Sequence, residues 1–517
     1  MNFKNIKKVV ASWFSRPWYP IAISAYPVMA LLSANTGQVQ PGVVVRPMVA
    51  SVVFGGLLFL IVWLFTPGRQ IHKAAFLTTL LLALFFTYGH AYIYIDQKFP
   101  DANYTIWLAV GWIILFFLGV FWTARPKLTF VSSAATLNTV ALALLIMSLA
   151  QTSFGDGPRG AHALGLKNAP IDSNLVRSDD PPDVYFFLLD SYTRADLLKQ
   201  AYGFDNSEFI NELERREFFV AQCSQSNYVR TELSLASSLN MEYLQELDEA
   251  FTPKSIARRV LWDSLTHSAV RYNFESMGYE TVGFETWFAW LDLTDADHYL
   301  SPPPISSGMT EFEALFLRTT AARYAQDLGL VDPDYLLGVG FRDRFNFIFN
   351  SIDGISKDQK PTFSYIHVIS PHPPFVFDAE GNPTYPPDFW NDKGLYTPDL
   401  YQKGYVDQLQ HLNKTMLDAI DTIITNSEVP PIIIIQGDHG PWMQPKEKRF
   451  LNMTAIYFPG HKDEIYSTIS PVNIFRLVFN TYFGGKYDIL EDVSYFSPVP
   501  NLYDFSEIPY PCNITDH

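Results

Sequence analysis

The chain has 517 residues, more than one ordinary domain accommodates, so two or more parts are expected. Its net charge of −16 argues against a nucleic-acid-binding surface, which needs patches of lysine and arginine. The two cysteines, Cys223 and Cys512, are too few for a disulfide framework or a cysteine-rich zinc site. One disulfide between them remains open.

The first third of the chain is predicted to be a transmembrane domain. Five apolar stretches there are long enough to cross a hydrocarbon core, which takes roughly 20 helical residues. They cover residues 18–34, 47–65, 74–95, 104–122 and 134–150. Buried core helices of a large soluble protein are the alternative, which five such stretches in close succession disfavour.

The charges between these stretches predict their orientation. Basic residues precede the first stretch and lie between the second and third and between the fourth and fifth, where they include Arg69, Lys73, Arg125 and Lys127. The positive-inside rule therefore places the N-terminus in the cytoplasm. An odd number of crossings then places everything after residue 150 outside.

The sequence predicts three parts, which are a membrane domain over residues 1–150, a linker over 151–182 and an outer domain over 183–517. The linker is rich in Gly, Pro, Ser and Asp and has no sustained periodicity. In the outer domain, short apolar strands such as "VYFFLL" and "PPIIIIQ" alternate with amphipathic helices such as residues 401–424. This alternation predicts an α/β domain with a mostly parallel central sheet flanked by helices.

Three predicted strands lead into residues that bind metals in other proteins. The first ends at Asp190, the strand around Tyr365 leads to His372, and "IIIIQG" runs into Asp438 and His439. Singly, an Asp after a strand is most often a turn or helix cap, and a His before prolines is most often a loop residue. If the strands are neighbours, however, their carboxyl ends share one edge of the sheet and the three positions converge into a site.

These motifs resemble the alkaline phosphatase/sulfatase superfamily, in particular its membrane-anchored branch of lipoteichoic acid synthases and lipid A phosphoethanolamine transferases. "FFLLDSYTRADLL" resembles the strand and acidic metal ligand of that superfamily, "QGDHG" its second ligand pair, and "SPHPPF" its histidine loop. The resemblance implies five membrane helices joined to an extracytoplasmic sulfatase-like domain. It also implies a bacterial inner-membrane, multi-pass location.

The nucleophile is expected between the first and second of these motifs. Formylglycine sulfatases need Cys-x-Pro-x-Arg, whereas Cys223 is followed by "SQSN" and is a poor candidate. "RTELSLASSL" resembles the threonine that precedes a small-residue helix in the transferases, so we favour Thr231, with Ser226 and Ser234 as weaker candidates. The alternative for Thr231 is an ordinary helix N-cap.

The predicted centre holds a divalent metal ion on Asp190, Thr231, Asp438 and His439, and Mn²⁺ or Zn²⁺ suits this donor set best. Two departures from the transferase pattern matter, because the first ligand is Asp190 rather than Glu and no further His follows closely after His439. A single metal is therefore expected. His372 would contact the phosphoryl group or protonate the leaving group, and Arg194 would hold a phosphate oxygen or lie at the surface as an ordinary helix-start residue.

The resulting hypothesis is a membrane-embedded transferase with a phospholipid donor and a glycan or lipid acceptor. A covalent intermediate on Thr231 would carry a phosphoglycerol or phosphoethanolamine group. Hydrolysis of phosphate or sulfate esters is one alternative, and a non-catalytic membrane scaffold or sensor is another.

Overall fold

The structure, a computed structural model, describes residues 15–35, 38–99, 104–125, 127–154, 168–255, 258–286, 288–303, 308–355, 360–384 and 397–509. The chain divides into two compact units. Residues 1–158 and 309–337 form a helical unit, and residues 159–308 and 338–517 form an α/β unit. The sequence shows no sign that residues 309–337 leave the α/β unit.

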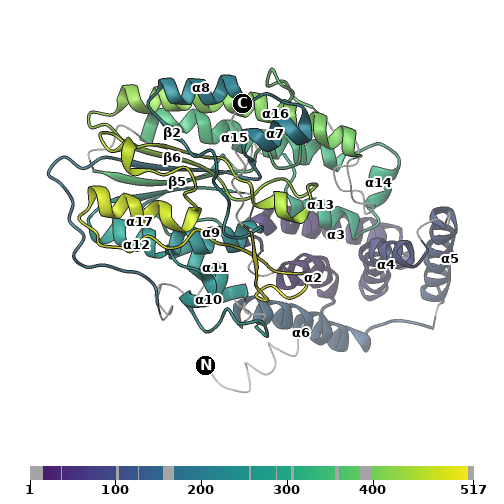
Figure 1. Cartoon of the computed structure of the whole chain (residues 1–517). Helices are drawn as coiled ribbons and strands as arrows, with labels where there is room; N and C mark the ends of the chain where they lie inside the picture. The colour runs from purple at the N-terminus through teal and green to yellow at the C-terminus, as the bar shows by residue number, and fades with distance from the viewer. Residues whose placement is uncertain are drawn as a thin grey trace, which may run out of the picture. The chain divides into compact units, whose positions relative to one another are not determined.

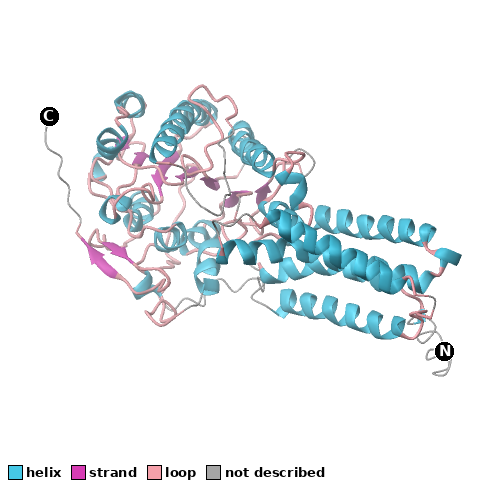
Figure 2. Ribbon diagram, turned by 90° about the vertical axis from the view of Figure 1, so that its right-hand side faces the viewer, coloured by secondary structure: helices cyan, strands magenta, loops and turns pink. Residues whose placement is uncertain are grey.

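The helical unit contains a bundle of apolar helices that run beside one another (Figure 2). They are α2 (Tyr19–Ala34), α3 (Val45–Phe65), α4 (Ile71–Lys98), α5 (Thr105–Thr123) and α6 (Ser133–Phe154). Within the described residues, 4 helices are long and apolar enough to cross a membrane, namely α3, α4, α5 and, over Ser133–Thr152, α6. The first predicted span folds into α2, which is 16 residues long and contains Pro27, and it falls short of that length. Five spans are therefore not confirmed.

A seven-stranded sheet in the order β2-β7-β6-β1-β5-β3-β4 forms the centre of the α/β unit. The strands are β1 (Val184–Leu189), β2 (Phe219–Val220), β3 (Glu280–Phe284), β4 (His298–Leu300), β5 (Thr362–Val368), β6 (Ile432–Gly437) and β7 (Thr454–Tyr457). β6, β1, β5, β3 and β4 are parallel, whereas β7 is antiparallel to both of its neighbours, β6 and β2. The predicted α/β class with a mostly parallel sheet is confirmed. A separate two-stranded sheet joins β8 (Ser494–Phe496) to β9 (Ser506–Ile508).

Helices cover both faces of the sheet (Figure 1). One face packs against α9 (Thr231–Asn240), α10 (Leu244–Leu247), α11 (Arg258–Thr266), α12 (Ala269–Ser276) and α17 (Pro471–Tyr482). The other packs against α7 (Ala195–Tyr202), α8 (Ser207–Arg215), α15 (Pro333–Ile355) and α16 (Pro398–Asn426). Because both faces are buried, β1 and β6 carry apolar side chains toward each of them: Phe186 and Ile434 lie in one core, and Phe187 and Ile435 in the other.

Of the predicted linker, residues 151–154 form the end of α6, residues 155–167 lie outside the described residues, and the structure describes the rest from Asn168 onward. Its second half packs on the α/β unit. The amide of Asn168 donates to the carbonyl of Leu247, Leu175 is buried in the core, and the amide of Val176 donates to the carbonyl of Phe483. This half of the linker belongs to the α/β unit.

Candidate metal centre

The carboxyl ends of three adjacent strands meet at the candidate site. β1 lies between β5 and β6, and Leu189 is in register with Val368 on one side and Gly437 on the other. Asp190 follows β1 directly, and Asp438 and His439 follow β6. Residues more than 240 positions apart in sequence therefore share one sheet edge, as expected for ligand sites of open α/β sheets.

Asp190, Asp438 and His439 form a buried cluster whose ligand atoms all lie within 4.8 Å of one another. Their exposed fractions are 3%, 0% and 8%. The hydroxyl of Thr231 lies 3.3 Å from Nε2 of His439. The structure thus brings together the four residues that the sequence predicted as metal ligands.

The hydrogen bonds of Asp438 leave one of its oxygens available. Oδ1 accepts the backbone N–H of Ser191 and that of His439, both at 2.9 Å. Oδ2 is buried, lies 3.3 Å from Nε2 of His439 and has no hydrogen-bond partner among the described residues. A buried carboxylate oxygen without a donor is costly unless a cation lies against it, so this oxygen fits a metal ligand.

The electrostatics of the cluster also fit a bound metal ion. Burial and the neighbouring negative charge of Asp190 raise the pKa of Asp438. Burial opposes ionisation of Asp190 too, but the charge of His372 and the imidazole of His367 outweigh it and hold the pKa of Asp190 well below its usual range. Burial lowers the pKa of His439, and the charges of Asp438 and Asp190 more than reverse this, so that its pKa is raised. Two adjacent buried carboxylates repel each other, and a bound divalent cation removes that repulsion.

Thr231 is the first residue of α9, not its N-cap. The residue before it, Arg230, has extended backbone angles and occupies the cap position without a side-chain capping bond. Thr231 therefore does not occupy the N-cap position that was the alternative explanation for this residue. Its hydroxyl lies next to Nε2 of His439 instead. The N-terminus of a helix also carries a partial positive charge, which favours a phosphate group beside Thr231.

Two histidines from β5 and the loop after it lie next to Asp190. The backbone N–H of His372 donates to the carbonyl of Asp190 at 3.0 Å, and Gln408 of α16 holds the carbonyl of His372. His367 lies within β5, is 1% exposed, and places Nε2 3.6 Å from Oδ2 of Asp190. Sequence reasoning missed His367, because a histidine inside an apolar strand gives no motif; its only signal is a polar residue where a strand with two buried faces should be apolar.

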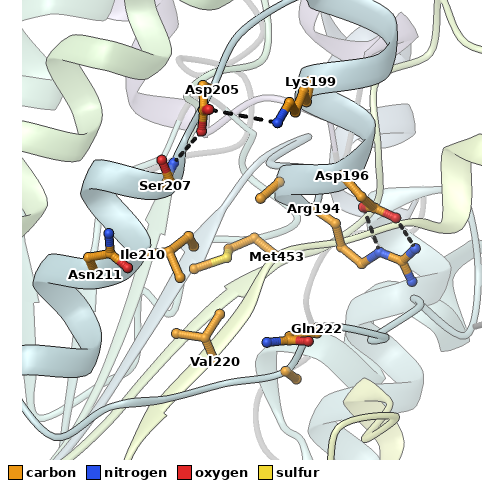
Figure 3. A pocket seen from close by; sticks show the side chains of 12 residues that line it. Arg194, Asp196, Lys199, Asp205, Ser207, Ile210, Asn211, Val220, Gln222 and Met453 are labelled. Atoms are coloured by element: carbon orange, nitrogen blue, oxygen red, sulfur yellow. Dashed lines mark hydrogen bonds and ion pairs between the residues drawn. The ribbon is translucent and has the colours of Figure 1, made fainter. Parts of the chain in front are cut away.

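Arg194 does not reach the cluster. Its guanidinium binds both carboxylate oxygens of Asp196, at 3.0 and 2.5 Å (Figure 3). It also donates to the carbonyl of Ser224. It lines a separate cavity of about 340 Å³, together with Lys199, Gln222 and other residues. Arg194 is 6% exposed, so it is not an ordinary surface residue, and its contact with a phosphate oxygen stays a prediction.

The weaker nucleophile candidates, Ser226 and Ser234, are both buried. The Ser234 hydroxyl donates to the carbonyl of Asp438 at 2.7 Å and so supports the loop after β6. Ser226 is fully buried, and its hydroxyl has no hydrogen-bond partner among the described residues. Cys223 is buried and disulfide-bonded, so its sulfur is not available as a nucleophile.

The loop after β1 is held by a buried polar network and a close backbone contact. The Tyr192 hydroxyl donates to Asn413 at 2.6 Å and accepts from Asn206 at 3.0 Å. The Tyr405 hydroxyl donates to the carbonyl of Ser191 at 2.7 Å. A Cβ on Gly437 would lie 2.1 Å from the carbonyl oxygen of Tyr192, so only glycine lets β6 approach this loop. Ser191 has a φ of 64°, a left-handed conformation that places its N–H against Asp438.

No family model matches the chain, and no curated protein matches its sequence. Among solved structures, 61 chains match. The periplasmic domain of EcEptC from Escherichia coli in complex with Zn is 12% identical with a TM-score of 0.43, and the match covers 66% of this chain and 97% of that domain. The soluble domain of lipooligosaccharide phosphoethanolamine transferase A from Neisseria meningitidis is 13% identical, with a TM-score of 0.37 and coverage of 59% and 90%.

The phosphonate monoester hydrolase of Agrobacterium radiobacter is a further neighbour, 13% identical with a TM-score of 0.37, and the match covers 61% of this chain and 80% of that one. Phosphoethanolamine transferases and sulfatases, the families that the sequence motifs resemble, are both among the neighbours. At these identities and TM-scores the likeness does not establish an activity for this chain.

Proposed function

We propose that the protein is a membrane-anchored, metal-dependent transferase that moves a phospholipid head group to an extracytoplasmic acceptor through a covalent intermediate on Thr231. One observation carries the proposal: the Thr231 hydroxyl lies 3.3 Å from His439 at the rim of a buried cluster that could hold a metal ion. A threonine hydroxyl is a weak nucleophile at neutral pH and needs activation by a base or a metal. A metal ion held by this cluster would lie next to the Thr231 hydroxyl and could activate it.

The ligands of the metal would be Asp190, Asp438, His439 and the Thr231 hydroxyl. Two carboxylates, one imidazole and one hydroxyl are a donor set that suits Mn²⁺ or Zn²⁺. When bound, the ion lowers the pKa of the threonine hydroxyl and neutralises charge on the phosphoryl oxygens. One metal ion is expected from this donor set.

The chain's own residues divide the reaction between them. Oγ1 of Thr231 attacks the phosphorus of the donor, and the bond from phosphorus to the diacylglycerol oxygen breaks as the new ester forms. His372 is the residue proposed to give that leaving oxygen its proton, because its backbone is fixed on Asp190 and its loop follows β5 at the same sheet edge. In the first step the Thr231 hydroxyl releases its proton to water. In the second step an acceptor oxygen attacks the phosphorus and gives its proton to His372, which restores the acid, while the bond from phosphorus to Oγ1 breaks and Thr231 takes a proton back from water.

The apolar helices support a lipid as donor. Four of them are long enough to cross a bilayer, and an enzyme held in a membrane meets phospholipids at high local concentration. Phosphoglycerol and phosphoethanolamine are the proposed head groups, and a glycan or another lipid is the proposed acceptor. If the positive-inside rule holds for the basic loops, the reaction takes place on the outer side of the inner membrane.

The test is head-group release from labelled phospholipids by the purified full-length protein. Thr231→Ala should lose activity by about 10³-fold or more, because no other hydroxyl occupies the position. Thr231→Ser, which keeps a hydroxyl, is the matched control and should retain much more activity than the alanine variant. Diacylglycerol release undiminished in Thr231→Ala would disprove the nucleophile assignment.

Two further measurements separate the alternatives. Release of the head group at the same rate with and without acceptor would identify a hydrolase, with water as the acceptor. A protein that binds no stoichiometric Mn²⁺ or Zn²⁺ and releases no head group would be a scaffold or sensor.

A further inference from the structure

Residues 309–337 come from the outer part of the sequence but belong to the helical unit. They contain α13 (Glu311–Arg318) and α14 (Arg323–Asp327), and α15 begins within them at Pro333. Figure 1 shows α13 near α3 and α14 near α4, in agreement with contacts of residues 309–337 with Arg46 of α3 and Phe85 of α4. An excursion of this kind needs a physical reason, since the α/β unit has its own cores on both faces of its sheet.

α13 is attached to the bundle by an apolar contact and an ion pair. Phe312 is 3% exposed and packs with Val28 and Leu32 of α2, which are 0% and 4% exposed. On the neighbouring turn, Arg46 at the start of α3 makes a two-pronged ion pair with Glu313, at 2.8 and 2.6 Å. A charged pair next to an apolar contact is typical of the polar boundary of a membrane helix bundle.

The turn after α13 reaches further along α4. A Cβ on Gly89 would lie 2.2 Å from the carbonyl oxygen of Arg318 and 2.3 Å from the carbonyl carbon of Thr319, so the turn is in backbone contact with the helix. The backbone N–H of Ala321 donates to the carbonyl of Phe85 at 2.8 Å. Small residues that let backbones touch are the usual device of membrane helix packing.

The length of α4 places this contact within the hydrocarbon layer. At 1.5 Å per residue, Phe85 lies about 21 Å and Gly89 about 27 Å from the start of α4 at Ile71, next to the basic Arg69. The hydrocarbon core is about 30 Å thick, and helix tilt only lowers these heights. The turn from Arg318 to Ala321 therefore lies on the membrane side of the outer boundary.

The two hydroxyls of the turn are hydrogen-bonded within the protein, as a lipid environment requires. Thr319 and Thr320 are 7% and 2% exposed, and their hydroxyls donate to the carbonyls of Phe316 and Leu317, each at 3.0 Å. The backbone N–H of Thr320 donates to that same carbonyl of Leu317.

Aromatic and cationic side chains lead from the hydrocarbon layer to the membrane interface, since Tyr92 lies about 32 Å from the start of α4 on the same rise of 1.5 Å per residue. The hydroxyls of Tyr88 and Tyr324 are hydrogen-bonded at 2.8 Å, and the guanidinium of Arg323 lies 3.4 Å from the ring centre of Tyr92. Tyrosine and arginine are enriched where a bilayer meets water. α14 thus runs at the interface, with its end one turn beyond Tyr324.

At that end, Leu328 and Leu330 are 71% and 74% exposed. A leucine side chain that stays exposed to water contributes no hydrophobic stabilisation, whereas burial of the same side chain among acyl chains is favourable. We propose that residues 309–337 are a re-entrant membrane element: the turn at Arg318–Ala321 packs into the outer half of the bundle, and Leu328 and Leu330 lie among the acyl chains of the outer leaflet. The occupant of this apolar surface is phospholipid, because residues 309–337 belong to the same compact unit as four helices that are long and apolar enough to cross a membrane.

The test is fluorescence of the full-length protein in phospholipid vesicles, labelled at Leu330→Cys with an environment-sensitive dye. Cys223 is buried and disulfide-bonded, so the introduced thiol is the reactive site. Val176→Cys in the α/β unit is the matched control, because Val176 is another exposed apolar residue, at 67%. We expect a blue shift and loss of fluorescence with lipids that carry a nitroxide near the top of the acyl chain at position 330, and neither at position 176.

A second variant tests the docking itself. Gly89→Leu should push the turn off α4 and reduce lipid quenching of the label at position 330. Gly111→Leu on α5 is its control, because a side chain at Gly111 meets nothing within 4 Å. The proposal is overturned if the label at Leu330→Cys is quenched by a water-soluble quencher and not by nitroxide lipid. It is also overturned if the label is shielded by a second copy of the chain, seen as quenching that depends on protein concentration.

Discussion

Gly437→Ala tests whether the approach of β6 to the loop after β1 builds the metal centre. The added Cβ would start 2.1 Å from the carbonyl oxygen of Tyr192, and it needs at least 3.0 Å. The loop and the strand end must therefore separate by about 0.9 Å. If that movement is taken up between Ser191 and Asp438, their 2.9 Å hydrogen bond is stretched beyond the roughly 3.2 Å limit of a good bond.

The expected loss follows from what that bond does. A hydrogen bond to a charged group contributes about 1.5–3 kcal/mol, and loss of a residue that orients a metal ligand typically costs about 10–100-fold in metal affinity. We therefore expect Gly437→Ala to bind Mn²⁺ or Zn²⁺ at least about 10-fold more weakly than the parent protein. Isothermal titration of the full-length protein in detergent measures this directly.

The matched control is Gly354→Ala on α15, where an added Cβ meets nothing within 4 Å. It should leave metal affinity unchanged, and it should raise the stability of the helix by up to about 1 kcal/mol. If Gly437→Ala binds metal as tightly as Gly354→Ala, then the close approach of β6 does not position the cluster, and our account of the site is wrong.

Two further predictions concern stability. Ile434→Ala in β6, where the side chain is fully buried, should cost about 2–5 kcal/mol through the cavity it leaves, whereas Ile489→Ala, at a 44% exposed position, should cost far less; thermal unfolding compares them. The hydrogen bond from Asp295 raises the pKa of His267, so the contribution of this pair is fully present below the unfolded pKa of about 6.5 and is lost as pH rises through the folded value. Because Asp295 is half exposed, the loss should be only about 0–1 kcal/mol. Melting temperatures of the parent and His267→Gln should therefore differ at pH 6 and converge toward pH 8.5, and a constant difference would contradict this.

The strands and the candidate ligand positions at their ends could be predicted from the sequence because their physical causes are local. β1 and β6 are buried on both faces, so "VYFFLL" and "IIIIQG" are continuous apolar runs, and the residues that end them are polar. The long apolar helices could be predicted from the sequence equally well, because crossing a hydrocarbon layer requires a long apolar run in one segment. α2 shows the limit of that signal, since an apolar stretch need not fold into a helix of full spanning length.

Tertiary structure alone decided which residues meet. The four residues of β7 do not indicate the direction of the strand, which depends on its pairing with β6. His367 lies near Asp190 only because β5 lies beside β1. The guanidinium of Arg194 binds Asp196 and the carbonyl of Ser224 instead. The position of residues 309–337 follows from contacts with Gly89 and Arg46, which are more than 200 residues away. A local sequence pattern cannot predict partners at that distance. Short-range patterning therefore determined the elements and the ends of the strands, and long-range packing decided the geometry of the candidate centre.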